Sequence, residues 1–324
     1  MQTNDPESRT EATKHPRGPQ GDDLPERQQR GLSPYHNHRR HGYVVAATGA
    51  PGPVFAPHPL ILRLSAKPGS HRNLNLATTL SVVQRWRKAI LSHSNGLSER
   101  VRCMLSGHDA NGDPADDPHL AFLPLAFVGH EHADGHLLGM GLALPFRISR
   151  DERREALRAI AAVHELKLGP LGVWSVEPVT MSQPPWNLHP EAWTAHPRGA
   201  THWATVTPIA FDRHPKAKDK AQHQQEAAAM IAEACIRVGL PKPREVIVTP
   251  VSVHFGVPPA FAFPRLARKD GSERQHTHAI LVFDEPVCGP LLVGAGRFRA
   301  YGVCRPMDAE HESGRGKRFH GHWV

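Results

Sequence analysis

Apolar residues along the chain fall into continuous runs, typical of buried strands, and runs with helical spacing. The stretch at 54–66 is largely apolar and predicts a strand. It precedes a segment whose apolar residues recur at intervals of three, four or seven, which predicts a helix: Leu76, Leu80, Val83, Ile90 and Leu91. After a loop rich in Gly, Asp and Pro at 106–118, the runs 119–125 and 137–145 predict buried strands.

A helix and a further strand complete the first block of elements. Ser149 and Glu152 form a capping-box pattern before the helical segment 151–163, and the next apolar run predicts a strand at 172–178. A Pro- and Trp-rich connection at 182–200 follows. Beyond it the order of elements starts again, with a strand, a helix that stops at Gly239, and two further strands, at 202–209, 220–238, 244–253 and 277–283.

Two successive blocks of strand, helix and strands predict an α+β fold of tandem ferredoxin-like units with antiparallel sheets. The predicted helices are too few to cover both faces of a doubly wound parallel sheet. The repetition concerns the order of elements, because no internal sequence identity accompanies it.

The two ends of the chain differ from the middle. Residues 1–43 carry almost no large apolar side chains, so we expect a disordered tail. The segment 307–324 predicts a second, basic tail. No apolar run is long enough to cross a membrane and no signal-peptide core is present, which favours a cytoplasmic protein without a membrane partner.

Charge and composition narrow the class of partner. The chain has 39 Lys and Arg against 31 Asp and Glu, a formal net charge of +8, which favours an anionic partner such as nucleic acid. With 24 histidines in 324 residues, any single histidine is a weak indication of a site. The four cysteines are too widely spaced for a CxxC zinc or redox motif.

A glycine-rich segment near the carboxyl end interleaves glycines with arginines. Glycines let a backbone approach phosphate closely, and guanidinium groups bind phosphate and stack on bases. No GK[ST] sequence follows, so the segment differs from a P-loop. It predicts an RNA-binding loop with these residues: Gly294, Gly296, Arg297, Arg299, Gly302 and Arg305.

Three strings, at 118–145, 203–216 and 289–306, carry a family resemblance. The last resembles the glycine-rich loop of the RAMP superfamily of CRISPR proteins, which are built from ferredoxin-like folds. Together they are similar to the fused crRNA-processing and Cascade subunit of type I-G (I-U) systems. The resemblance implies a reduced handle-capping region at 44–117 and a repeat-RNA endoribonuclease with two ferredoxin-like units at 118–306.

The resemblance also implies a reaction. In such enzymes the ribose 2′-OH attacks the adjacent phosphorus without a metal or other cofactor, leaving a 2′,3′-cyclic phosphate. The implied partners are CRISPR repeat RNA, mature crRNA and other Cascade subunits. Because the catalytic histidine of relatives lies between the first strand and first helix of the first unit, we predict His130 or His132, with His119 in reserve.

Two alternatives remain at this point. The first is a non-catalytic scaffold that holds RNA through the glycine-rich loop. The second is a zinc hydrolase, because HEHADGH at 130–136 resembles the HxHxDH signature of metallo-β-lactamases, although Gly135 is inserted before the last histidine. Its further ligands would come from residues elsewhere in the chain: His202, Asp212 or His254.

Overall fold

The computed structural model describes residues 53–268 and 270–307. The predicted disordered tail at 1–43 lies outside the described residues, and so does the basic tail predicted at 307–324 except for Met307. Within the described ranges, no helix is both long and apolar enough to span a membrane.

The first half of the described chain forms a five-stranded sheet with strand order β2-β3-β1-β5-β4. All pairs are antiparallel, and Leu62 of the central strand lies opposite both Met140 and Pro178. Its elements are β1 (Leu60–Ala66), α1 (Thr79–Ser92), α2 (Glu99–Ser106), β2 (Ala121–Ala126), β3 (Leu137–Ala143), α3 (Arg150–Ala161), β4 (Glu165–Lys167) and β5 (Val173–Pro178).

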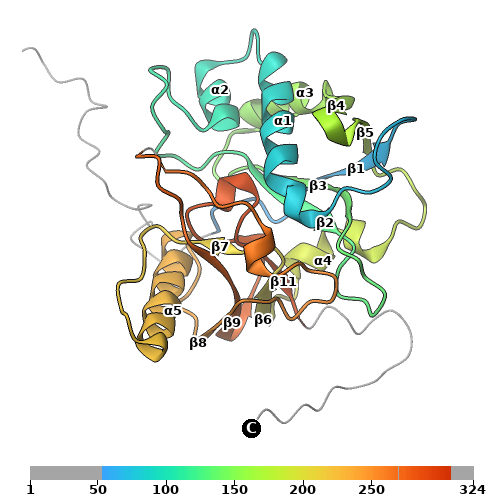
Figure 1. Ribbon diagram of the computed structural model, residues 1–324. Helices are drawn as coiled ribbons and strands as arrows, with labels where there is room; N and C mark the ends of the chain where they lie inside the picture. The colour runs from blue at the N-terminus through green and yellow to red at the C-terminus, as the bar shows by residue number, and fades with distance from the viewer. Residues whose placement is uncertain (1–52, 269, 308–324) are drawn as a thin grey trace, which may run out of the picture. The chain divides into compact units, whose positions relative to one another are not determined.

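Local sequence explains where the helices of this half begin and end. The predicted capping box is confirmed, since the Ser149 side chain accepts from the Glu152 amide and the Glu152 carboxylate accepts from the Ser149 amide. The pattern did not predict α2, which is short and ends at Gly107 with φ of 76°. The helices α1, α2 and α3 lie together beside the first sheet (Figure 1).

The second half forms a second antiparallel sheet, in which β8 and β6 flank β9 and β11 follows β6. The helix α5 packs beside it (Figure 1). The short helix α4 (Glu191–Thr194) precedes this second half. The elements of the second half are β6 (Ala200–Thr205), β7 (Ile209–Ala210), α5 (Lys220–Arg237), β8 (Glu245–Thr249), β9 (His276–Val287), β10 (Leu291–Leu292) and β11 (Val303–Pro306).

Both sheets have ferredoxin-like strand order, so the predicted fold class is confirmed. In the second unit the glycine-rich segment stands where a second helix would connect β9 to the last strand. The predicted boundary after residue 117 differs from the structure, because β1 pairs with β3 and β5. The first ferredoxin-like unit therefore begins near residue 60, inside the region expected to be a separate handle-capping part.

The larger of two hydrophobic cores contains residues of both units. The larger buried cluster contains residues of the first sheet and α1 together with Leu292, Tyr301 and Val303 of the second unit. A smaller cluster fills the space between the second sheet and α5. The glycine-rich segment therefore lies against both units.

Candidate functional site

The glycines of the segment 288–302, here called the glycine-rich loop, are required by its own packing. Gly294 has φ of +88°, and a Cβ there would lie 2.6 Å from the Ala210 carbonyl oxygen. Gly302 has φ of +67°, and a Cβ would lie 1.8 Å from the Val293 carbonyl oxygen. A Cβ added to Gly296 would lie 2.5 Å from the Cβ of Tyr301. These contacts explain the three glycines without a ligand.

The predicted arginines of the loop differ in exposure. Arg299 is exposed and Arg297 is half-buried, both in the short 3-10 turn Arg297–Arg299. The Arg297 guanidinium donates to the Gly294 carbonyl at 3.2 Å and lies 4.6 Å from the centre of the Phe298 ring. Arg299 is therefore the loop arginine most available to a phosphate.

Arg305, the third predicted arginine, lies buried between the two units. Only 2 % of it is exposed, and its Nη1 donates to the carbonyl oxygen of Val128 at 3.3 Å. Val128 follows β2 of the first unit, whereas Arg305 belongs to β11 of the second. This arginine therefore joins the two units.

Arg87 on α1, in the first unit, holds the glycine-rich loop in place by a hydrogen bond. Its guanidinium donates to three carbonyl oxygens, those of Ser106 at 2.8 Å, Leu120 at 3.2 Å and Phe298 at 2.7 Å. Burial and, secondly, the charge of Arg299 lower the pKa of Arg87 to about 10, so it is still charged at neutral pH. The sequence pattern gave no indication of this residue.

Two further arginines gather near the loop. Arg274 donates to the carbonyls of Phe211 at 3.0 Å and Asp212 at 2.9 Å, and Arg268 donates to the latter at 3.3 Å. Burial, then the charge of Arg268, lowers the pKa of Arg274, and Arg299 adds to this effect. The loop thus belongs to a cationic surface to which both units contribute.

His119 is the predicted catalytic histidine that contacts this loop. Its ring stacks on Phe298 with centroids 3.5 Å apart, and its edge fills the space beside Gly107. Burial, followed by the charge of Arg87, lowers the pKa of His119 to about 3. The imidazole is therefore neutral at pH 7, which suits a packing role and makes it a poor proton donor.

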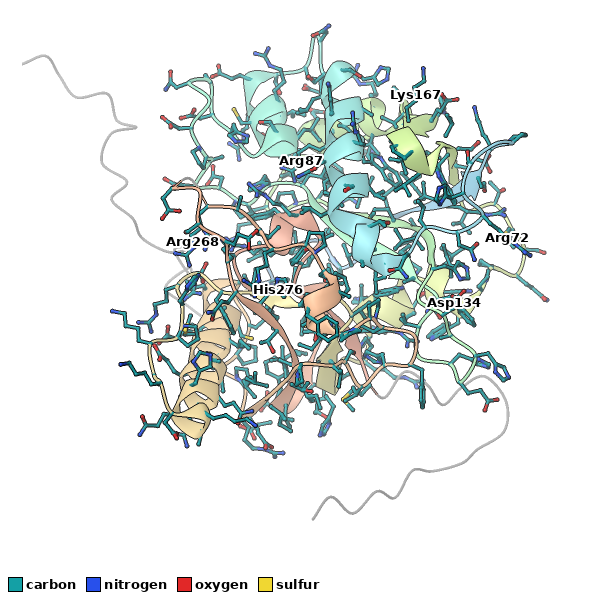
Figure 2. All side chains as sticks on the ribbon, in the orientation of Figure 1. Arg72, Arg87, Asp134, Lys167, Arg268 and His276 are labelled. Atoms are coloured by element: carbon teal, nitrogen blue, oxygen red, sulfur yellow. The ribbon has the colours of Figure 1, made fainter. Side chains whose placement is uncertain are left out.

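His130 and His132 lie elsewhere, in the β2–β3 loop at 127–136. Both are exposed, their ring centroids are 5.4 Å apart, and the His132 amide donates to His130 Nδ1 at 3.1 Å. Asp134 of this loop lies on the opposite side of Figure 2 from Arg268. The predicted histidines and the predicted RNA-binding arginines are not brought together.

The interval between the first strand and the first helix is also corrected. The interval covers residues 67–78, because the first strand is β1 and the first α-helix is α1. The residues at 119–136, where it was expected, come after both of these elements. The interval contains His71, which is exposed. This histidine was missed although the strand at 54–66 and the helix near residue 76 were both predicted, since the first unit was placed after residue 117.

The two histidine-bearing loops are neighbours. The Leu76 amide donates to the Gly135 carbonyl at 3.0 Å, and the Leu137 amide donates to the Leu74 carbonyl at 2.8 Å. Arg72 and Asp134 accordingly lie on the same side of Figure 2. His71, His130 and His132 therefore occupy two bonded loops at one side of the first unit.

The zinc interpretation is not supported by this arrangement. His136 Nδ1 bonds Asp134 Oδ1 at 2.5 Å, but within the described ranges no three His, Cys, Asp or Glu side chains form a metal-binding group. Of the proposed distal ligands, Asp212 pairs with Arg237. His254 is 5 % exposed, and burial followed by the charge of Arg305 lowers its pKa to about 3.

Comparison with known proteins gives a family match over residues 33–306, to "CRISPR-associated protein, GSU0054 family". A search of curated sequences found no significant match. Solved structures of low similarity include Cas6b, with 12 % identity over 76 % of this chain and 98 % of that one at a TM-score of 0.40.

Two other structures resemble the chain at a similar level. One is Csf5, a type IV CRISPR-Cas crRNA endonuclease, with 15 % identity, 76 % and 98 % coverage of the two chains, and a TM-score of 0.36. The other is described as a RAMP protein binding different RNA substrates, with 12 % identity, 76 % and 97 % coverage, and a TM-score of 0.37. Since the family match covers most of the sequence, the chain belongs to the CRISPR-associated GSU0054 family.

Proposed function

We propose that this protein binds CRISPR repeat RNA and cuts it, acting as the crRNA-processing subunit of a type I-G complex and keeping the mature guide. The observation that carries the proposal is the exposed Arg299 on a loop held in place by Arg87, in a chain of a CRISPR-associated family. A phosphate backbone is the ligand that such a fixed guanidinium surface favours.

The chemistry requires a group that removes the 2′-OH proton and a group that protonates the leaving 5′-oxygen. Exposed histidines suit either role, and general acid–base catalysis contributes roughly 10²- to 10⁴-fold. His71, His130 and His132 are the candidates, since each is exposed on one of the two bonded loops. An RNA bound at Arg299 would run along α1 to reach them.

The second candidate function is a non-catalytic RNA scaffold. The lowered pKa of His119 favours it, because this predicted catalytic histidine contacts the glycine-rich loop and at pH 7 is not in the charged form that would protonate a leaving oxygen. In that case another enzyme cuts the RNA, and this protein holds the product.

Synthetic CRISPR repeat RNAs, labelled at the 5′ end and incubated with the full chain in EDTA, distinguish the two functions. Cleavage that leaves a 2′,3′-cyclic phosphate supports the endoribonuclease, whereas tight binding without cleavage supports the scaffold. Failure to bind any repeat RNA contradicts both. Cleavage that EDTA abolishes would instead support a metal-dependent mechanism.

Single alanine variants then locate the catalytic histidine. We expect one of H71A, H130A and H132A to lose cleavage by at least about 100-fold while keeping RNA affinity. H164A, at an exposed histidine after α3, is the control and should cut at the wild-type rate. Wild-type cleavage by all three variants would contradict the assignment.

A further inference from the structure

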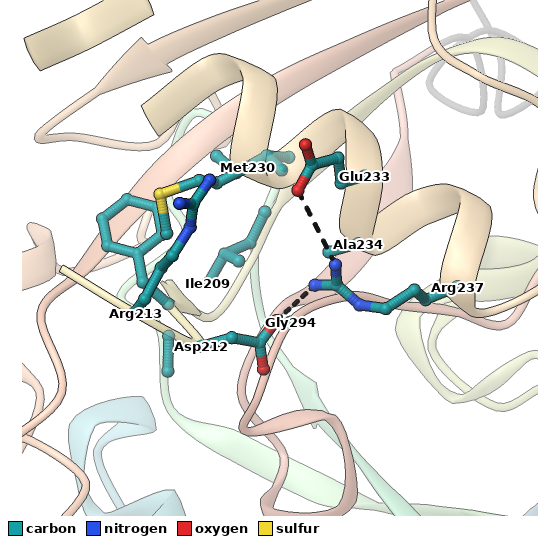
Figure 3. A pocket seen from close by; sticks show the side chains of 11 residues that line it. Ile209, Asp212, Arg213, Met230, Glu233, Ala234, Arg237 and Gly294 are labelled. Carbon is teal, nitrogen blue, oxygen red and sulfur yellow. Dashed lines mark hydrogen bonds and ion pairs between the residues drawn. The ribbon is translucent and has the colours of Figure 1, made fainter. Parts of the chain in front are cut away.

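A cavity of about 190 Å³ lies between β7, α5 and the glycine-rich loop (Figure 3). Ordinary small-molecule sites have volumes of roughly 300–1,000 Å³, so this cavity accepts a group the size of one ring system. Its walls are mostly apolar and come from both sides of the cavity: Ile209, Ala210, Phe211, Met230, Ile231 and Ala234. Such walls favour a flat, weakly polar group.

The mouth of the cavity is charged. The Arg237 guanidinium lies between two carboxylates, donating from Nη2 to Asp212 Oδ2 and placing Nη1 3.9 Å from Glu233 Oε2 (Figure 3). Arg213 stands at the same mouth and is exposed. The rim therefore presents both hydrogen-bond donors and acceptors, as the edge of a nucleobase does.

The cavity is joined directly to the glycine-rich loop. Gly294 forms one of its walls, and the Ala295 amide donates to the Ala210 carbonyl at 2.9 Å. Arg297 is bonded to the Gly294 carbonyl at 3.2 Å. A strand whose phosphates meet Arg297 and Arg299 therefore passes the mouth of the cavity.

Resting on the proposed function, we propose that this cavity takes a single unstacked nucleobase of the RNA whose backbone lies on the glycine-rich loop. The apolar walls replace the stacking that the base gives up, and the rim groups bond its polar edge. The exposed guanidinium of Arg213 adds a flat cationic surface at the entrance. The site thus reads one nucleotide, while the arginines of the loop contact phosphates of any sequence.

The test uses the full chain and the repeat RNA that binds it most tightly, with abasic nucleotides introduced one position at a time. We expect removal of one particular base to weaken wild-type binding by roughly tenfold. Ala234→Leu fills the cavity from α5 and should bind intact RNA as weakly as the wild type binds that abasic RNA. The same abasic change should then have no further effect.

Ala229→Leu is the matched control, because Ala229 is an exposed residue of α5 that does not line the cavity. It should show the wild-type base dependence. Arg213→Ala, at an exposed position, should weaken the contribution of the same base, and it keeps the test informative if Ala234→Leu fails to fold. The inference is overturned if no base matters more than twofold, or if Ala234→Leu retains the dependence. Absence of any RNA binding by the wild type would instead refute the proposed function.

Discussion

The guanidinium of Arg87 donates to the carbonyl oxygen of Phe298 at 2.7 Å, across 211 positions of the sequence. The same side chain bonds the Ser106 and Leu120 carbonyls, so one residue joins α1, the last residue of α2, the residue before β2 and the glycine-rich loop. The conformation of the loop is therefore set by the first unit as well as by the second.

Arg87→Ala should lower the free energy of unfolding by about 2–4 kcal/mol, because three carbonyls lose a charged donor in a largely buried site. Urea denaturation measures this change. Arg85→Ala, at an exposed arginine of the same helix, should stay within about 0.5 kcal/mol of the wild type. Equal stability of the two variants would show that the bonds of Arg87 contribute nothing.

Arg299→Ala should weaken RNA binding while leaving stability unchanged, because the side chain is exposed. For single-stranded RNA, loss of one phosphate contact reduces the slope of log K against log salt by about 0.7. Binding measured at several salt concentrations checks this value. Arg305→Ala should show the opposite behaviour, with a clear loss of stability since that arginine is buried. A salt slope unchanged by Arg299→Ala would remove the loop from the RNA-binding surface.

Stability should fall on mild acidification because two buried histidines resist protonation. Burial lowers the pKa of His254 to about 3 and of His278 to about 4, below the ordinary value of about 6.5. Below pH 6.5 the unfolded chain therefore binds protons that the folded chain does not. Their stabilising contribution is complete above about pH 6.5 and is lost as pH falls toward the folded values.

The expected loss is at most about 1.4 kcal/mol per pH unit for each histidine, measured by urea denaturation between pH 7 and pH 5. His278→Gln should reduce this pH dependence, whereas His164→Gln, at an exposed histidine, should leave it unchanged. A wild-type stability that stays constant over this range would contradict the assignment.

Gly302→Ala should severely destabilise the fold, by more than about 4 kcal/mol, because the added Cβ would lie 1.8 Å from the Val293 carbonyl oxygen at a φ of +67°. Gly112→Ala is the control for backbone strain alone. Gly112 has φ of +83° with open space around its Cβ position, so about 1 kcal/mol is expected. Thermal unfolding of the two variants separates steric collision from strain.

Periodicity predicted the fold well where a segment is long and its local signals agree. The capping box at Ser149 and the helix at 220–238 are of this kind, since capping and spacing depend on neighbours in the sequence. The short helix α2 was missed because its eight residues make only about two turns, too short for a helical period to stand out from the sequence. The start of the first unit was misplaced because sheet pairing depends on partners far along the chain.

The site was less predictable for the same reason. Glycines and arginines made the loop stand out in the sequence, but the sequence could not distinguish exposed Arg299 from buried Arg305. Arg87 carries no motif, and its role arises only when α1 meets the loop. His71 was missed because the first unit was expected to begin after residue 117. The cavity beside Gly294 could not be predicted because its walls come from three segments that are distant in sequence.

Arg87 and Arg305 form hydrogen bonds between the two units in opposite directions. Arg87 of the first unit donates to the Phe298 carbonyl of the second, and Arg305 of the second unit donates to the Val128 carbonyl of the first. This has a consequence for the order of events during synthesis. When the first unit leaves the ribosome, Arg87 lacks the Phe298 carbonyl and Val128 lacks its arginine donor, because both partners lie more than 150 positions downstream. The glycine-rich loop is thus made after the whole first unit, and its arrival completes the unit made first.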